Sequence, residues 1–157
     1  MLQAKIIEEA ANPWASNLVV VPRPGNPVPR ITVDYRKLNA ITYRDRFPLP
    51  RISDCLDAMS GSACFSALDL SCSFNQVPID PRDRDKTAFL TRRGQFRFQV
   101  MPQGAVNCLS VFSRLSQMVL RGLSPTCYAV YIDDTVVLGQ SFEQAAANLE
   151  LVLDRFR

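Results

Sequence analysis

The sequence predicts an α+β protein in which helices cover one face of an antiparallel sheet. Segments rich in β-branched residues, separated by clusters of turn-forming residues, predict pairs of short strands. Two longer segments, 107–120 and 142–157, carry apolar residues at helical spacing and predict amphipathic helices. Apolar residues make up 47% of the 157 positions, which is enough for a core of ordinary domain size.

Local signals define the elements in the first part of the chain. Residues 2–11 are expected to form a short helix that ends before Asn12-Pro13. The apolar run 18–21 and the alternating segment 30–35 predict a hairpin around a turn rich in proline. Residues 52–59 are expected to form a helix that Gly61 closes.

The second part of the chain is expected to alternate strands with the two amphipathic helices. Strands are predicted at 64–70, 86–90, 95–100, 127–132 and 135–138, and the last two should meet at Asp133-Asp134. The final helix should turn four apolar side chains inward: Leu149, Val152, Leu153 and Phe156. This helix shows no capping signal at its end, so we expect the chain to be a piece of something longer.

Composition excludes several classes of site. The chain contains no histidine, which removes the Ser-His-Asp and Cys-His hydrolases and every metal site that needs histidine. Its five cysteines are widely spaced and odd in number, which argues against a disulfide framework or a zinc site. No apolar run approaches the ~20 residues that cross a bilayer. We therefore expect a soluble intracellular protein whose catalysis would rest on carboxylates with a hard metal ion.

Basic residues gather in two segments, although the net charge is only +3. Seven arginines and lysines lie within 23–51, and six lie within 82–97. Scattered charge of this kind is usually a solvated surface. It is equally compatible with a face that binds phosphate groups, and charge alone does not separate the two interpretations.

Carboxylates interrupt two apolar strand segments. Asp133 and Asp134 adjoin between 128–132 and 135–138, and Asp69 ends another apolar run. Buried strands seldom carry charge, and neighbouring like charges cost energy. The acid pair could be a polar hairpin turn, and Asp69 could be a helix cap. If the two strands are neighbours, the three carboxylates would instead need cations, and two Mg²⁺ ions ~3.5–4 Å apart would suit phosphoryl transfer.

The segment Tyr131-Ile132-Asp133-Asp134 resembles the Tyr-x-Asp-Asp box of reverse transcriptases. Six further blocks occur in the order seen in gypsy-class LTR retrotransposon polymerases, at 13–16, 33–39, 47–50, 65–70, 85–89 and 101–104. A lone Tyr-x-Asp-Asp box would be weak evidence for this family, whereas ordered blocks over almost the whole chain are specific evidence for it. The resemblance implies reverse-transcriptase fingers and palm, with an antiparallel palm sheet backed by helices and with the thumb absent.

The resemblance also implies an activity and its catalytic residues. The implied enzyme is an RNA-directed DNA polymerase that adds dNTPs to a primer 3′-hydroxyl on an RNA or DNA template. Asp69, Asp133 and Asp134 would hold two Mg²⁺ ions, which Mn²⁺ could replace. Asp133 is the more secure ligand of the adjacent pair, because successive strand residues point to opposite faces and Asp134 would need turn geometry to join it.

Further matched positions imply contacts with the incoming nucleotide. Arg30 and Arg23 would bind its triphosphate. Phe74 would exclude a ribose 2′-hydroxyl by steric clash, although without the motif it would be an ordinary core aromatic. Gln103 would lie near the sugar, and Gly104 would permit close approach of the backbone.

The resemblance places the fingers at about 1–60 and 77–105 and the palm at about 61–76 and 106–157. The implied partners are a primer-template, dNTPs, and the thumb, connection and ribonuclease H regions of a larger polyprotein. A retroelement particle in the cytoplasm, or the nucleus, is the expected location, without secretion or a membrane.

Three positions depart from the family pattern: Ser73, Asn75 and Leu109 stand where the family has Gly, His and Pro. Without a thumb we expect weak or no polymerisation by this chain alone. The alternative is a non-catalytic remnant, domesticated or decayed, that binds nucleic acid.

Overall fold

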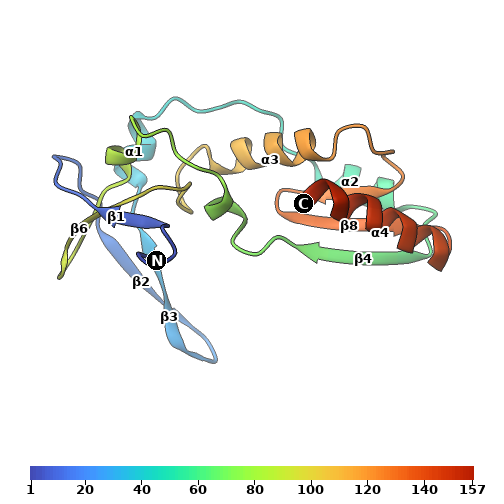
Figure 1. The fold of residues 1–157 in the computed structure, drawn as a ribbon, viewed down its shortest axis with the longest axis horizontal. Helices are drawn as coiled ribbons and strands as arrows, with labels where there is room; N and C mark the ends of the chain where they lie inside the picture. Colours follow the sequence, from blue (N-terminus) through green and yellow to red (C-terminus); the bar gives the residue numbers. More distant parts are fainter. The chain divides into compact units, whose positions relative to one another are not determined.

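A computed structural model describes all of residues 1–157 (Figure 1). The chain forms two compact units. The first comprises Met1–Arg44 and Phe74–Cys108, and the second comprises Asp45–Ser73 and Leu109–Arg157. Both units combine helices with antiparallel strands, so the predicted α+β class is confirmed. None of the helices has both the length and the apolar character that a membrane span requires.

The first unit contains a three-stranded antiparallel sheet and a separate hairpin. The sheet has the order β1 (Ile7–Glu9), β6 (Gly94–Phe98) and β5 (Phe89–Thr91). The hairpin consists of β2 (Leu18–Arg23) and β3 (Asn26–Val33). The short helix α1 (Arg36–Ile41) and the 3-10 turn η2 (Arg84–Thr87) complete the unit, and a second 3-10 turn, η1 (Ser73–Gln76), begins at its border.

The predicted helix over residues 2–11 is wrong, because Ile7–Glu9 form a strand. In the register of β1 on β6, Ile7 lies opposite Phe98 and Glu8 lies opposite Arg97. Ile7 packs on the core, and Arg97 Nε lies 2.7 Å from Glu8 Oε1. Pairing with a distant strand therefore outweighs the weak local preference for a helix.

The core of the first unit is mostly aromatic. Phe89 lies between Phe98 and Phe96, with ring centroids at 5.3 Å and 6.1 Å, and all three rings are buried. Tyr35 is 2% exposed and donates its hydroxyl to the Thr87 carbonyl at 2.9 Å. Burial raises the pKa of the Tyr35 hydroxyl, so it stays a neutral donor.

The second unit is built on one antiparallel sheet. Its strands follow the order β4 (Cys64–Asp69), β8 (Asp134–Gly139) and β7 (Tyr128–Tyr131). The helices of this unit are α2 (Ile52–Met59), α3 (Cys108–Val119, whose first residue falls in the first unit) and α4 (Phe142–Phe156). Figure 1 shows α4 lying along β8 and β4.

Helix α4 covers the face of the sheet that carries Val137. Val152 of the helix, Val137 and Leu120 are fully buried together, and Leu149 and Phe156 pack around them. Three of the four predicted inward residues are therefore confirmed. Leu153 is 40% exposed, since it follows Val152 and lies about 100° further around the helix.

Residues 45–60 lie in the second compact unit, and their assignment to the fingers stays a prediction. Helix α2 packs against β7, where Cys55 Sγ donates to the Val130 carbonyl at 3.4 Å. Helix α2 therefore contacts the sheet of the second unit through Cys55, although none of its residues is buried and Ile52 and Leu56 stay exposed.

Candidate functional site

Two of the three predicted acids face each other across neighbouring strands. Asp69 is the last residue of β4, and it pairs in register with Asp134, the first residue of β8. Directly opposed residues project from the same face, with Cβ atoms about 4.5–5.5 Å apart. The next pair, Leu68 and Thr135, projects to the core face under α4. Asp69 and Asp134 therefore share the other face, where both are exposed.

No positive charge compensates this pair within the chain. Neither Asp69 nor Asp134 has a side-chain hydrogen bond or an ion pair. The helix-cap interpretation of Asp69 is therefore not supported, since its carboxylate accepts no backbone N–H. Like charges directly opposed across strands are destabilising by roughly 0.2–1 kcal/mol. A bound cation would convert this repulsion into attraction.

The third acid, Asp133, lies in the turn and not at a strand end. Strand β7 ends at Tyr131, the turn residues are Ile132 and Asp133, and β8 begins at Asp134. The predicted meeting of the strands at Asp133-Asp134 is thus one residue too late. The polar-turn interpretation describes Asp133 but not Asp134. Asp133 would therefore depend on the turn conformation to reach the other two acids. The sequence had predicted this dependence for Asp134.

Ser73 is a contact of Asp133 that the sequence did not reveal. Its hydroxyl donates to Asp133 Oδ2 at 3.4 Å, and Ser73 is 4% exposed. The sequence signal was the replacement of a family glycine by a residue with a hydroxyl group.

The turn that carries Asp133 is strained. Ile132 has φ = 61°, and Asp133 does not have a positive φ. Positive φ at the first residue of a two-residue turn is the type II′ pattern, in which glycine is usual. A β-branched residue in this region is an outlier that costs about 1–2 kcal/mol. Such strain is typical of functional sites.

Replacing Ile132 with glycine is therefore expected to stabilise the protein. Relief of the positive φ outweighs the roughly 0.5–1 kcal/mol entropy cost of glycine. The free energy of unfolding, measured by urea denaturation, should rise by up to about 1 kcal/mol. Ile132→Val keeps the β-branched strain and is expected to give no gain. A glycine variant less stable than the parent would show that side-chain contacts of Ile132 outweigh the strain.

The three acids suit a hard divalent cation in their chemistry, because every donor is a carboxylate oxygen. The structure brings two of them together, and the third stands in the adjoining turn. No three acidic or cysteine side chains converge into one metal-binding group. The opposed Asp69–Asp134 pair is therefore the part of the predicted metal site that the backbone itself positions.

All five predicted nucleotide-binding residues lie in the first unit, and three of them, Arg30, Gln103 and Gly104, are close together. Arg30 Nη2 donates to Gln103 Oε1, which joins the β2–β3 hairpin to the segment before α3. Gly104, next in the chain, has φ = +101°, a conformation that favours glycine. Asn39, which the sequence did not single out, holds this segment. It donates to the Gly104 carbonyl at 2.9 Å and accepts from Val106 N at 2.9 Å.

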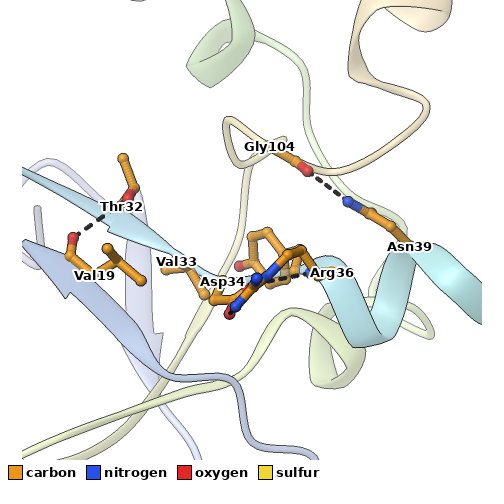
Figure 2. Close-up of a pocket in the computed structure, with 8 residues that line it drawn as sticks. Val19, Thr32, Val33, Asp34, Arg36, Asn39 and Gly104 are labelled. Carbon is orange, nitrogen blue, oxygen red and sulfur yellow. Dashed lines mark hydrogen bonds and ion pairs between the residues drawn. The ribbon is translucent and has the colours of Figure 1, made fainter. Parts of the chain in front are cut away.

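Gly104 and Asn39 line an open hollow of about 440 Å³ in the first unit (Figure 2). Asp34 and Arg36 form an ion pair on its wall, with Nη2 and Oδ2 2.6 Å apart. The hydrogen bonds from Arg36 lower the pKa of the Asp34 carboxyl to about 2. The hollow is thus lined by one ion pair, by polar groups of Thr32, Asn39 and Gly104, and by the side chains of Val19, Val33 and Tyr35.

The other two predicted nucleotide contacts, Arg23 and Phe74, lie in other elements. Arg23 is exposed at the tip of the β2–β3 hairpin, where it pairs with Asn26. Phe74 is half-buried in η1. Their roles toward a nucleotide remain predictions.

The family model described as "Reverse transcriptase (RNA-dependent DNA polymerase)" matches residues 22–157. The chain belongs to the reverse transcriptase family. The resemblance found in the sequence motifs is therefore confirmed.

Two relatives of this chain are retrovirus-related Pol polyproteins. The chain is 34% identical over 162 residues to the retrovirus-related Pol polyprotein from transposon 412 of Drosophila melanogaster, covering 100% of this chain and 13% of that protein. It is 33% identical over 159 residues to the Pol polyprotein from transposon gypsy of the same organism, covering 98% of this chain and 15% of that protein. The chain thus spans a small part of the length of these relatives.

Solved reverse transcriptases share the fold. The foamy viral protease-reverse transcriptase in complex with an RNA/DNA hybrid superposes with a TM-score of 0.90 at 22% identity. The match covers 99% of this chain and 20% of that one. The predicted fingers-and-palm fold of a reverse transcriptase is confirmed.

Proposed function

We propose that the chain is the fingers-and-palm part of an RNA-directed DNA polymerase, with its divalent cations held by Asp69, Asp133 and Asp134. The observation that carries the proposal is the direct pairing of Asp69 with Asp134, two exposed carboxylates without a countercharge. Membership of the reverse transcriptase family supplies the reaction class. Asp69 and Asp134 lie far apart in the sequence but are neighbours in the fold.

In phosphoryl transfer, the three acids of the chain would hold the cations. The cations, when bound, would activate the primer 3′-hydroxyl and neutralise charge on the triphosphate. Asp69 and Asp134 would hold a cation from opposite strands, and Asp133 would complete the set from the turn. Mg²⁺ is the expected ion, since all donors are carboxylate oxygens, and Mn²⁺ could replace it.

Arg30 is proposed to bind the triphosphate of the incoming dNTP. A guanidinium can contact phosphate oxygens in a bidentate manner, and Gln103 already orients this one by accepting one of its N–H groups. Arg23 would assist from the hairpin tip, Phe74 would exclude ribonucleotides, and Gly104 would allow close approach of the substrate. The template and primer would be RNA or DNA strands.

A non-catalytic remnant that binds nucleic acid is the second candidate. Two observations favour it: no three acids converge, and Asp133 accepts a hydrogen bond from Ser73. The two candidates differ in whether a divalent cation binds at the acids.

Thermal unfolding with and without Mg²⁺ or Mn²⁺ tests the proposal. A cation at about ten times its Kd should stabilise the folded state by roughly 1.4 kcal/mol and raise the thermal midpoint. Asp69→Asn should abolish this rise. Without metal the same variant should be more stable than the parent by about 0.2–1 kcal/mol, because the opposed charges are gone. A merely damaged protein would not show these opposite signs.

Asp57→Asn is the matched control. Asp57 is an exposed carboxylate of α2 in the same unit, and its loss should leave the metal response intact. If neither cation moves the midpoint of the parent, or if Asp57→Asn loses the response as well, the remnant interpretation is preferred.

A further inference from the structure

The Ser73 hydroxyl connects two segments that each carry a proposed cation ligand. It donates to Asp133 Oδ2 at 3.4 Å, although the two residues are 60 positions apart in the chain. Ser73 follows Asp69 by one short turn, and both Ser73 and Asp133 belong to the second unit. The hydrogen bond therefore joins the segment after Asp69 to the turn that carries Asp133.

Ser73 presents this hydroxyl from a defined position. The residue is 4% exposed, and its backbone N–H donates to the Leu70 carbonyl at 3.1 Å. Cys72, directly before it, has φ = +52°, a conformation that residues with a side chain rarely adopt. The chain therefore bends sharply before Ser73, and burial together with the backbone hydrogen bond holds the serine in place.

Asp133, in contrast, lies in a turn whose conformation is costly. The positive φ of Ile132 strains this turn, so other turn conformations compete with the one observed. Each of them would carry the half-buried Asp133 carboxylate to a different position. A cation must draw Asp133 toward the Asp69–Asp134 pair, since no three acids converge. The hydrogen bond from Ser73 limits the range of positions from which that movement starts.

We propose that Ser73 is a positioning residue that prepares Asp133 for cation binding. A carboxylate has two oxygens with about four lone-pair sites, so a hydrogen bond to Oδ2 leaves Oδ1 free for a cation. Carboxylates that bind metals are commonly hydrogen-bonded in turn, and such partners orient them. A carboxylate that is already held at one oxygen also loses less freedom when the cation binds. The Ser73 hydroxyl should therefore tighten cation binding without touching the cation.

This inference rests on the proposed function, because it assumes that the three acids bind a divalent cation. It adds a residue that a metal-ligand motif would not contain, since the family has glycine at position 73. The opposite role is also conceivable, in which the hydroxyl competes with the cation for Asp133. Removing a competitor would tighten cation binding, whereas removing a positioning residue would weaken it. The sign of the change in Kd therefore separates the two roles.

Titration of the chain with Mn²⁺ tests the role of Ser73 without substrate or turnover. Electron paramagnetic resonance measures the free ion, whose sharp signal falls as the ion binds, and so gives the Kd. In Ser73→Ala the Kd should rise about tenfold, the lower end of the range for such partners, because a 3.4 Å hydrogen bond is long. Ser73→Thr keeps the hydroxyl, and its Kd should stay within about threefold of the parent.

Ser113→Ala is the matched control. Ser113 lies in α3 of the same unit, is 3% exposed, and has a buried hydroxyl without a hydrogen-bond partner. Its replacement removes the same group from an equally buried place, so the Kd should stay within about twofold of the parent.

Three results would overturn the positioning role of Ser73 while leaving the proposed function intact. They are a Kd that is unchanged or lower in Ser73→Ala, a Ser73→Thr variant that binds as weakly as Ser73→Ala, and an equal loss of affinity in Ser113→Ala. A parent chain that binds no Mn²⁺ would instead overturn the proposed function, and this inference with it.

Discussion

Replacing Gly139 with alanine is expected to lower the free energy of unfolding by about 3 kcal/mol, the largest stability change that we expect from adding one methyl group. A Cβ at Gly139 would lie 2.5 Å from Ala145 N and 2.7 Å from Ala145 Cα. Both are backbone atoms at the start of α4, which cannot rotate away as a side chain can. Forced overpacking of this kind costs about 1–3 kcal/mol or more. Urea denaturation followed by circular dichroism measures the loss.

The displacement of α4 in Gly139→Ala should also disturb the position of Asp134, because both residues belong to β8. Gly139 and Asp134 are the two ends of β8, so displacing α4 from the strand disturbs the element that begins with Asp134. Adding Ala145→Gly to this variant tests the cause. It removes the Cβ contact at 2.7 Å but leaves the two backbone contacts, so most of the loss should remain. Full recovery would show that the clash is between side chains alone.

Primer extension by this chain alone is expected to be weak and to disappear as salt is raised. Eight of the thirteen basic residues in 23–51 and 82–97 have no ion pair, since only Arg36, Arg82, Arg84, Lys86 and Arg97 are paired. If six of the eight contact phosphates, binding should weaken by about a thousandfold between about 50 and 200 mM salt. Product is measured on an RNA template with Mg²⁺ and dNTPs.

The Asp69→Asn variant is the control for this assay, because it keeps the basic residues and loses a proposed metal ligand. It should give no product at any salt concentration. Processive extension by the parent chain at physiological salt would contradict the expectation and show that fingers and palm suffice to hold a primer-template.

Local pattern was sufficient for much of the fold. The apolar spacing of 107–120 and 142–157 predicted α3 and α4 to within a few residues, because a helix buries one face at a period of 3.6. Strand positions such as β4 and β6 followed from β-branched and aromatic runs between turns. Local pattern failed at Ile7–Glu9, where a partner strand about ninety positions away in the chain determines the structure. It also missed α1, a helix of six residues.

The sequence by itself determined the family, the α+β class and the identity of the three acids, because ordered motifs and side-chain periodicity are written along the chain. Only the tertiary structure decided how the acids meet. The register of β4 on β8 sets Asp69 against Asp134, and a strained turn at Ile132 places Asp133 beside Ser73. It also decided which arginines remain without an ion pair. These features depend on pairing between residues that are distant in the chain, which no local pattern contains.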